Sequence, residues 1–259
     1  MTSPDGRPDA LKSRVRAFWD GRPCGSVHAQ AAEGTPQYFA QVEARRAELE
    51  PFIEDFAAFP DSRDRAVLEI GVGLGTDFIR YARAGARVTG VDLTPRAVEL
   101  TRRRLTNEGL QGDVRLADAE ALPFADGSFD TVYSWGVLHH TPDTRAAVRE
   151  ALRVLRPGGR VCVMLYGRRS WVSYGLWVRY ALLAGKLRTS LSDVLSHHME
   201  SEGTKGFTVR ELTQMFHGLE GLSIEHVGTP YDRRVAGPLV KFTGKWLGWF
   251  VVVRGTKAA

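Results

Sequence analysis

Cysteine is scarce in this chain of 259 residues. Its two cysteines, Cys24 and Cys162, are too few for a disulfide framework and do not have the spacing of metal ligands. The composition therefore predicts no metal site and suits a reducing compartment, so we expect a cytoplasmic protein. The segment Met1 to Asp9 lacks the apolar core of a secretory signal, and we expect no leader in it.

Long runs of one charge are also missing. The formal net charge is +5, but the longest run of consecutive Lys and Arg has three residues, 102–104. A nucleic-acid-binding face would concentrate its basic residues in a stripe with exposed aromatic side chains. We therefore interpret the basic residues as a solvated surface and expect no nucleic-acid partner.

The chain does have the composition of an ordinary globular protein, 43% hydrophobic and 25% charged, without an internal repeat. Its length predicts one domain with an extension or an insertion. The most informative stretch is 67–77, in which an apolar run passes through Glu69 and Ile70 into glycines at every second position, Gly71, Gly73 and Gly75. A helical pattern follows immediately. Strand, glycine turn and helix allow a ligand to approach the backbone closely and point free N–H groups at it.

The spacing of these glycines discriminates between two kinds of nucleotide site. A dinucleotide fingerprint starting at Gly71 would have its third glycine at position 76, which is Thr76. The early third glycine, together with the acid Glu69 in the strand, resembles motif I of class I S-adenosylmethionine (SAM) dependent methyltransferases. This resemblance implies that Glu69, the three glycines and Asp77 contact SAM.

A second strand is predicted over 87–92, ending in Asp92, with Leu93 next and Thr94-Pro95 opening a helix. A carboxylate at the tip of this strand is where a doubly wound sheet places an acceptor for ribose hydroxyls. The alternative for Asp92 is an ordinary cap at a strand end. We predict that Asp92 and Leu93 bind the cofactor.

Three further motifs follow in order between residues 114 and 166. Asp118-Ala119 resembles the adenine-recognising loop of the UbiE/COQ5-like (type 11) methyltransferases. The stretch 129–143, with Val-Leu-His-His and Pro-Asp, resembles motif IV of that family, and 155–159 resembles its motif VI. The resemblance implies that Asp118 and Ala119 bind adenine. We place Trp135 at the cofactor crevice, with plain packing as the alternative.

The resemblance also implies a fold. We expect an α/β protein with a doubly wound, mostly parallel sheet of seven strands, the last of them antiparallel between the fifth and sixth. The predicted division is an N-terminal helical cap (1–60), a SAM-binding core (61–166), a helical lid insertion between strands five and six (167–206), and a helix and strands that complete the sheet (207–259). The final strand is predicted over 246–254.

The lid contains the most apolar stretch of the chain, 171–184. It is too short for a membrane span and carries Arg179. A helix that is apolar on nearly all sides is buried or covered. We prefer a lid over an acceptor pocket; a peripheral membrane or lipid contact, a dimer contact and plain core are the alternatives, so the chain is expected to be a monomer or a homodimer.

The family resemblance implies transfer of a methyl group from SAM, with S-adenosylhomocysteine as product, to a small-molecule acceptor. A general base is needed only where the acceptor must lose a proton. Candidate bases are His139, Tyr166, His197 and His198, whereas His140 is interpreted as structural. The aromatic lid favours an apolar or aromatic acceptor of the natural-product or prenyl/quinone type. The other readings are a SAM-binding protein that does not methylate, a NAD-dependent reductase and an RNA methyltransferase.

Overall fold

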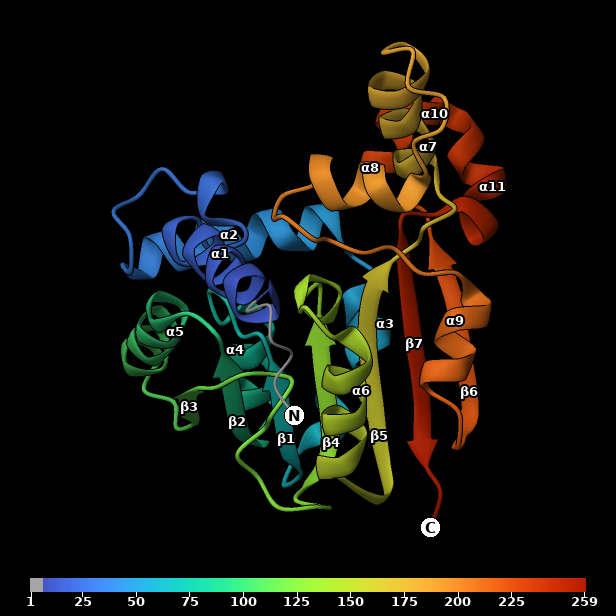
Figure 1. The fold of residues 1–259 in the computed structure, drawn as a ribbon. Coiled ribbons are helices and arrows are strands. Elements are labelled where there is room, and N and C mark those ends of the chain that lie inside the picture. The colour runs from blue at the N-terminus through green and yellow to red at the C-terminus, as the bar shows by residue number, and fades with distance from the viewer. Residues whose placement is uncertain (1–6) are drawn as a thin grey trace.

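The computed structural model describes residues 7–259, so most of the segment Met1 to Asp9 lies outside the described residues. Its centre is a seven-stranded sheet in the order β3-β2-β1-β4-β5-β7-β6 (Figure 1). Strand β7 pairs antiparallel with both β5 and β6, and the remaining pairs are parallel. This confirms the predicted fold class. The strands are β1 (Ala66–Ile70), β2 (Arg87–Asp92), β3 (Asp113–Leu116), β4 (Phe129–Trp135), β5 (Leu155–Tyr166), β6 (Leu219–Val227) and β7 (Phe250–Lys257).

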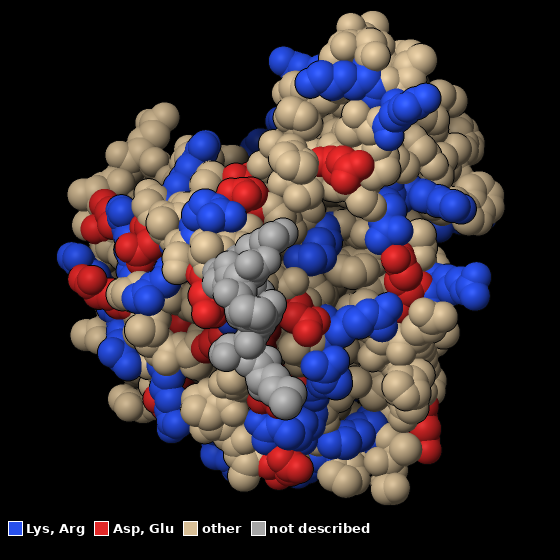
Figure 2. All heavy atoms as spheres, viewed as in Figure 1, with Lys and Arg blue, Asp and Glu red and all other residues tan. Residues whose placement is uncertain are grey.

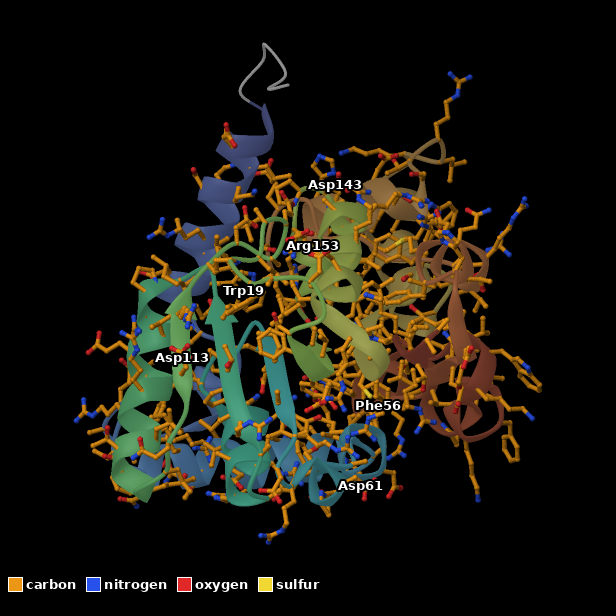
Figure 3. The ribbon with its side chains drawn as sticks, turned by 90° about the horizontal axis from the view of Figure 1, so that it is seen from below. Trp19, Phe56, Asp61, Asp113, Asp143 and Arg153 are labelled. Carbon is orange, nitrogen blue, oxygen red and sulfur yellow. The ribbon has the colours of Figure 1, made fainter. Side chains whose placement is uncertain are left out.

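Helices cover both faces of the sheet. Successive strand residues point to opposite faces, so Val67 packs with α3 and α4 whereas Leu68 packs with α6 and α9. Figure 3 shows Phe56 of α3 and Arg153 of α6 on opposite sides of the sheet. The helices of these two layers are α3 (Ile53–Ala57), α4 (Thr76–Arg83), α5 (Pro95–Glu108), α6 (Thr144–Val154) and α9 (Val209–Met215).

Local signals in the sequence set several helix ends. The Thr94 hydroxyl accepts a hydrogen bond from the Ala97 N–H, and Pro95 occupies the first turn of α5. Thr208 and Glu211 form a reciprocal capping box at the start of α9. Pro51 separates α2 (Pro36–Leu49) from α3, because a proline in a helix interior removes a backbone hydrogen bond.

The remaining helices lie above the carboxyl ends of the parallel strands (Figure 1). On one side are α1 (Arg7–Gly21) and α2; on the other a second group projects from the sheet. This group holds α7 (Trp171–Trp177), the π-helical turn η4 (Val178–Leu182), α8 (Leu191–His198), α10 (Pro230–Ala236) and α11 (Val240–Leu247). Short turns η1 (Ser26–His28), η2 (Phe59–Ser62), η3 (Leu138–His140) and η5 (Gly237–Leu239) complete the described chain. In residues 7–259 no helix combines the length and apolar character needed to span a membrane.

Two sequence expectations need correction. The last strand begins at Phe250 and not at Trp246, because Lys245 and Trp246 belong to α11 and face outward. The stretch 171–184 is not apolar core throughout, since Val178, Leu182 and Leu183 are 41%, 45% and 77% exposed. Helix α7 and turn η4 therefore divide it into a packed half and an exposed half.

Candidate functional site

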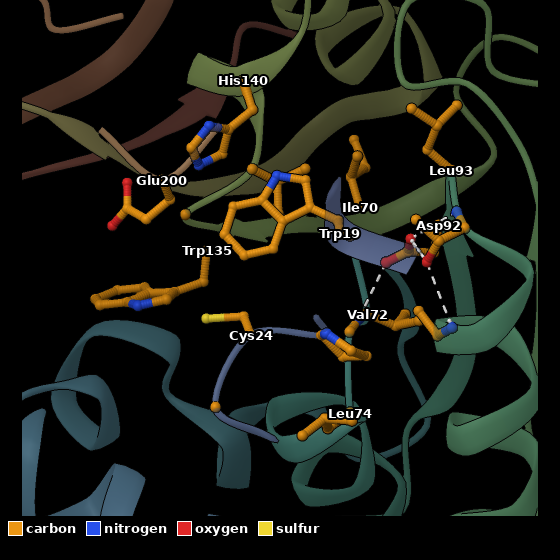
Figure 4. A pocket seen from close by; sticks show the side chains of 18 of the residues that line it. Trp19, Cys24, Ile70, Val72, Leu74, Asp92, Leu93, Trp135, His140 and Glu200 are labelled. Atoms are coloured by element: carbon orange, nitrogen blue, oxygen red, sulfur yellow. Dashed lines mark hydrogen bonds between the residues drawn. The ribbon is translucent and has the colours of Figure 1, made fainter. Parts of the chain in front are cut away.

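A cavity of about 750 Å³ lies at the carboxyl ends of β1, β2, β4 and β5. Helix α1 closes it from one side, and α7 and α10 reach it from the other. Figure 4 shows Asp92 and Leu93 at one end, Trp135 and Glu200 at the opposite end, and Trp19 of α1 between them. The size is that of pockets that enclose whole small molecules.

The glycine loop forms one wall of this cavity. Gly71 and Gly73 line it and have φ values of 83° and 53°, which only glycine adopts readily. Gly75, with φ 70°, does not line the cavity; it is the N-cap of α4 and packs close to Thr101. The loop therefore combines open backbone at the ligand with a sharp entry into the helix.

Gly71→Ala is expected to destabilise the protein by about 2–5 kcal/mol. A Cβ at Gly71 would lie 2.2 Å from a methyl group of Val137, and the cost adds overpacking to a positive φ. Gly73→Ala is the matched control, since it keeps a positive φ but would meet nothing within 4 Å. It should cost only about 1 kcal/mol. Urea unfolding of both variants measures the difference, and equal losses would contradict the role of the Val137 contact.

Asp92 lies beside this loop at the end of β2 and lines the cavity. One carboxylate oxygen accepts the Gly73 N–H at 3.0 Å, and the other accepts the N–H and hydroxyl of Thr94, both at 2.9 Å. Burial raises the pKa of Asp92, while these donors oppose the rise. The carboxylate is thus held in one orientation against the glycine loop. Leu93 lies next to it in the same wall.

Asp118 and Ala119 also line the cavity, on the side of α1. One oxygen of Asp118 accepts the Glu120 N–H at 2.9 Å, and the other forms an ion pair with Lys12 of α1. Lys12 also binds Glu120 at 2.7 Å. The helical cap is therefore attached directly to the loop that is predicted to hold adenine.

A cluster of buried charges lies beneath the glycine loop. Asp77 accepts Arg46 Nη2 at 2.6 Å and the Tyr133 hydroxyl at 2.7 Å through the same oxygen. Its other oxygen and Glu69 Oε2 are buried without a hydrogen-bond partner. Burial and the nearby Asp77 raise the pKa of Glu69 well above its usual value. Two acceptor oxygens at the cavity are thus free to receive donors from a ligand.

Trp135 closes the cavity floor at the end of β4. Its indole Nε1 donates to Glu50 Oε2 at 2.8 Å, and its ring packs against Phe52, Phe56 and Phe250. The side chain therefore both packs and lines the cavity, so the two sequence interpretations are compatible.

The predicted bases do not lie together. His139 is fully buried and stacks on Tyr166 with 3.8 Å between ring centroids, but it does not line the cavity. His197 binds the Asp193 carbonyl of its own helix, and His198 stacks on Tyr180. Neither of these two lines the cavity either. Adjacent histidines in sequence say little about which of them faces a pocket, and here the tertiary packing of α8 turns both away.

Tyr166 and His140 do line the cavity. Burial and the nearby Glu200 carboxylate raise the pKa of Tyr166 well above its usual value, so its hydroxyl is a donor at neutral pH. Burial lowers the pKa of His140 to about 3, and Ser201 and Thr204 bind its Nδ1. His140, interpreted from the sequence as structural, therefore has both an anchored and a cavity-facing side.

The sequence did not reveal Glu200, which follows α8. Glu200 is exposed and faces the cavity (Figure 4). Desolvation by the surrounding protein raises the pKa of its carboxyl group, and its Oε1 lies 3.4 Å from the Tyr166 hydroxyl. Cys24 is exposed and also faces the cavity, where desolvation by the surrounding protein raises the pKa of its thiol to about 11 and keeps it protonated. Only the polar character of the stretch 196–201 hinted at a site there.

Comparison with known proteins agrees with this geometry. Residues 68–163 match a family model described as "Methyltransferase domain". These residues form a methyltransferase domain, and their sheet has the fold of a SAM-dependent methyltransferase. They include the glycine loop, Asp92, the Asp118-Ala119 pair and motif IV, and the resemblance to the type 11 family is thereby confirmed.

Two relatives of the methyltransferase domain are named for their activity. Methyltransferase GfsG of Streptomyces halstedii is 41% identical over 105 residues, which are 39% of this chain and 38% of that protein. The 27-O-demethylrifamycin SV methyltransferase of Amycolatopsis mediterranei is 41% identical over 100 residues, or 38% of this chain and 37% of that protein. The chain thus spans less than half the length of the curated relatives it matches.

Solved structures share the fold over nearly the whole chain. The [4+2]-cyclase SpnF superposes with a TM-score of 0.58 at 19% identity, covering 98% of this chain and 95% of that one. A SAM-dependent methyltransferase of Thermotoga maritima, described as a possible histamine N-methyltransferase, gives 0.56 at 20% identity and covers 94% and 99%. At these identities the likeness shows the fold alone.

The residues around the cavity fit SAM, the cofactor of this family. Asp92 offers carboxylate oxygens where ribose hydroxyls would need acceptors. The orphaned oxygens of Glu69 and Asp77 suit the hydrogen-bond donors of a positively charged group of the cofactor, because Arg46 and Tyr133 bind only the other oxygen of Asp77. Leu74, Leu93 and Trp135 supply the apolar remainder of the wall.

Proposed function

We propose that this protein transfers the methyl group of SAM to a small, apolar or aromatic acceptor that binds in the same cavity. The observation that carries the proposal is the continuity of that cavity. From the glycine loop and Asp92 it extends past Trp135 to a second wall formed by Tyr166, Val172, Glu200 and Tyr231. A cofactor end and an acceptor end therefore share one enclosed space.

SAM supplies a methyl group on a sulfonium, which is already activated for transfer. The residues of this chain then have to align the acceptor and exclude water, and orientation alone can supply about 7–11 kcal/mol. Trp19 lies between the two ends of the cavity, and α1 covers it through the ion pair of Lys12 with Asp118. We assign Gly71 and Gly73 to the cofactor end of the cavity, together with the acids Glu69, Asp77, Asp92 and Asp118.

The acceptor end supports an apolar substrate of the natural-product or prenyl/quinone type. Its wall contains four aromatic rings, Tyr166, Tyr231, Trp249 and Phe250. The relatives named for methylation include one whose name specifies a rifamycin, which supports a role in secondary metabolism. The division into a cap (1–60), core (61–166), lid (167–206) and C-terminal part (207–259) stays a prediction, as do a cytoplasmic location and a monomer or homodimer.

Methyl transfer from SAM labelled in its methyl group tests the proposal. The acceptors are a panel of phenols, carboxylic acids and prenyl compounds, and the product is detected by the label. Transfer to at least one apolar acceptor by the wild type, and not by Asp92→Ala, is expected. Tight binding of S-adenosylhomocysteine with no transfer to any member of the panel would contradict the proposal.

A SAM-binding protein that does not methylate is the second candidate. It is favoured by one observation, the likeness over 98% of the chain to a structure named as a [4+2]-cyclase. Such a protein would bind the cofactor with the same residues but would convert an acceptor without loss of the labelled methyl group from SAM. Mass analysis of the acceptor in the labelled assay separates the two candidates.

A further inference from the structure

The helices that project above the sheet expose an unusual number of large apolar side chains. We call α7, η4, the loop to α8, α10, η5 and α11 the projecting layer (residues 171–190 and 230–247). In residues 9–259 eleven large apolar side chains are exposed, and eight of them belong to this layer. They are Val178, Leu182, Leu183, Leu187, Val235, Leu239, Phe242 and Trp246. Exposed apolar side chains that concentrate in one part of a protein mark an interaction site.

Side-chain contacts hold the two segments of the layer together. The indole of Trp171 in α7 donates to the Thr243 hydroxyl in α11 at 2.8 Å. Gly175 packs closely against Val235 of α10, and the Trp177 indole donates to the Thr189 carbonyl at 2.8 Å. The exposed leucines at 182–187 and the exposed rings of α11 are therefore parts of one packed unit.

The charge of the layer indicates what covers it. The projecting layer contains seven of the 35 Lys and Arg residues of the chain and one of its 30 Asp and Glu, the buried Asp232. Without the layer the chain would have 28 basic and 29 acidic residues, so the layer accounts for the positive net charge. Figure 2 shows Lys and Arg side chains on this projecting part.

Basic and apolar side chains alternate within the layer. In α11, Lys241 and Lys245 lie one turn apart, beside Phe242 and Trp246, which are 69% and 62% exposed. The ammonium group of Lys245 lies 4.3 Å from the Trp246 ring centroid. Lys186 and Arg188 likewise flank Leu187. Tryptophan, leucine and basic residues on one surface are the composition of helices that lie in the interface of an anionic bilayer.

We propose that the projecting layer docks on the surface of an anionic lipid bilayer. Its apolar side chains enter the headgroup boundary, and Arg179, Lys186, Arg188, Lys241 and Lys245 contact lipid phosphates. A protein partner fits less well, because protein–protein interfaces are depleted in lysine, whereas Lys241 and Lys245 lie beside the exposed Phe242 and Trp246. The same helices line the cavity, through Val172 of α7 and Tyr231 of α10. If the proposed function holds, an apolar acceptor can thus reach the cavity from the bilayer.

Co-sedimentation with vesicles tests the docking. The wild type should bind vesicles of equal parts phosphatidylcholine and phosphatidylglycerol, bind phosphatidylcholine alone much less, and detach as salt is raised. Replacing both Leu183 and Leu187 by Ser, or both Phe242 and Trp246 by Ser, should lower the partition by about tenfold or more. Val209→Ser is the matched control, since Val209 is 42% exposed on α9 outside the layer.

Each variant should bind S-adenosylhomocysteine as the wild type does, which separates docking from folding and from the proposed methyl transfer. Failure of the wild type to bind anionic vesicles would overturn the proposal. So would equal binding by the layer variants, or a homodimer in sedimentation velocity that these variants dissociate. The last result would assign the surface to a second copy of the chain.

Discussion

Asp92→Ala should weaken the binding of S-adenosylhomocysteine by roughly a hundredfold or more. Asp92 is held by the Gly73 and Thr94 donors at the end of β2, so its carboxylate is preorganised for two ribose hydroxyls. Each charge-assisted hydrogen bond contributes about 1.5–3 kcal/mol, and about 1.4 kcal/mol corresponds to tenfold in affinity. Isothermal calorimetry on both proteins measures the difference.

The matched control is Asp113→Ala on the edge strand β3, next to β2 (Figure 3). Asp113 is the same residue type, is largely open to solvent and pairs with Arg115, so its loss should leave the affinity unchanged. Asp92→Asn keeps the shape and removes the charge, and should fall between the wild type and Asp92→Ala. Equal affinity of the wild type and Asp92→Ala would refute the ribose assignment.

The cofactor end of the cavity was predictable because its residues follow one another closely in sequence. The strand, the alternate glycines and the acid at the next strand end are local patterns, and the sheet brings them together without further information. Even here one residue differs from the expectation that all three glycines contact the ligand. Gly75 turns the chain into α4 and does not face the cavity.

The acceptor end was less predictable because tertiary packing assembles it. Val172, Glu200 and Tyr231 come from three distant segments, and no local pattern relates them. His139 and His140 illustrate the same limit at the shortest range. Both lie in the single turn η3, and only the packing of Trp19 and Tyr166 around them decides that His140 faces the cavity.

The predicted start of the last strand, Trp246, was wrong because tertiary packing also decides where that strand begins. The stretch 246–254 is rich in aromatic and β-branched residues, which favours a strand throughout. In the structure, however, Gly244 and Gly228 allow α11 to pack against the end of β6, with their Cα atoms close to each other's Cβ positions. That contact continues the helix through Leu247 and delays the strand to Phe250.

Glu200→Gln should lower kcat for a hydroxyl acceptor by about 10²–10⁴-fold. Glu200 is the carboxylate at the acceptor end, and Tyr166, kept protonated by its raised pKa, can donate to it across 3.4 Å. This pairing leaves Glu200 as the group that accepts a proton from the acceptor. Gln keeps the size of the side chain but cannot take the proton. The affinity for S-adenosylhomocysteine should not change, and a steady-state assay with the acceptor found in the labelled panel measures kcat.

The pH profile distinguishes this role from a merely structural one. Desolvation by the surrounding protein raises the pKa of Glu200, so its charged, basic form exists above that raised value and is lost as the pH falls through it. The wild-type rate should therefore rise with pH on the acid side, and Glu200→Gln should lack this limb. The Tyr166 hydrogen bond lowers the pKa of Glu200, so Tyr166→Phe should move the limb to higher pH while its ring remains stacked on Trp249. An unchanged limb in both variants would exclude Glu200 as the base, and the search would then turn to the free Nε2 of His140.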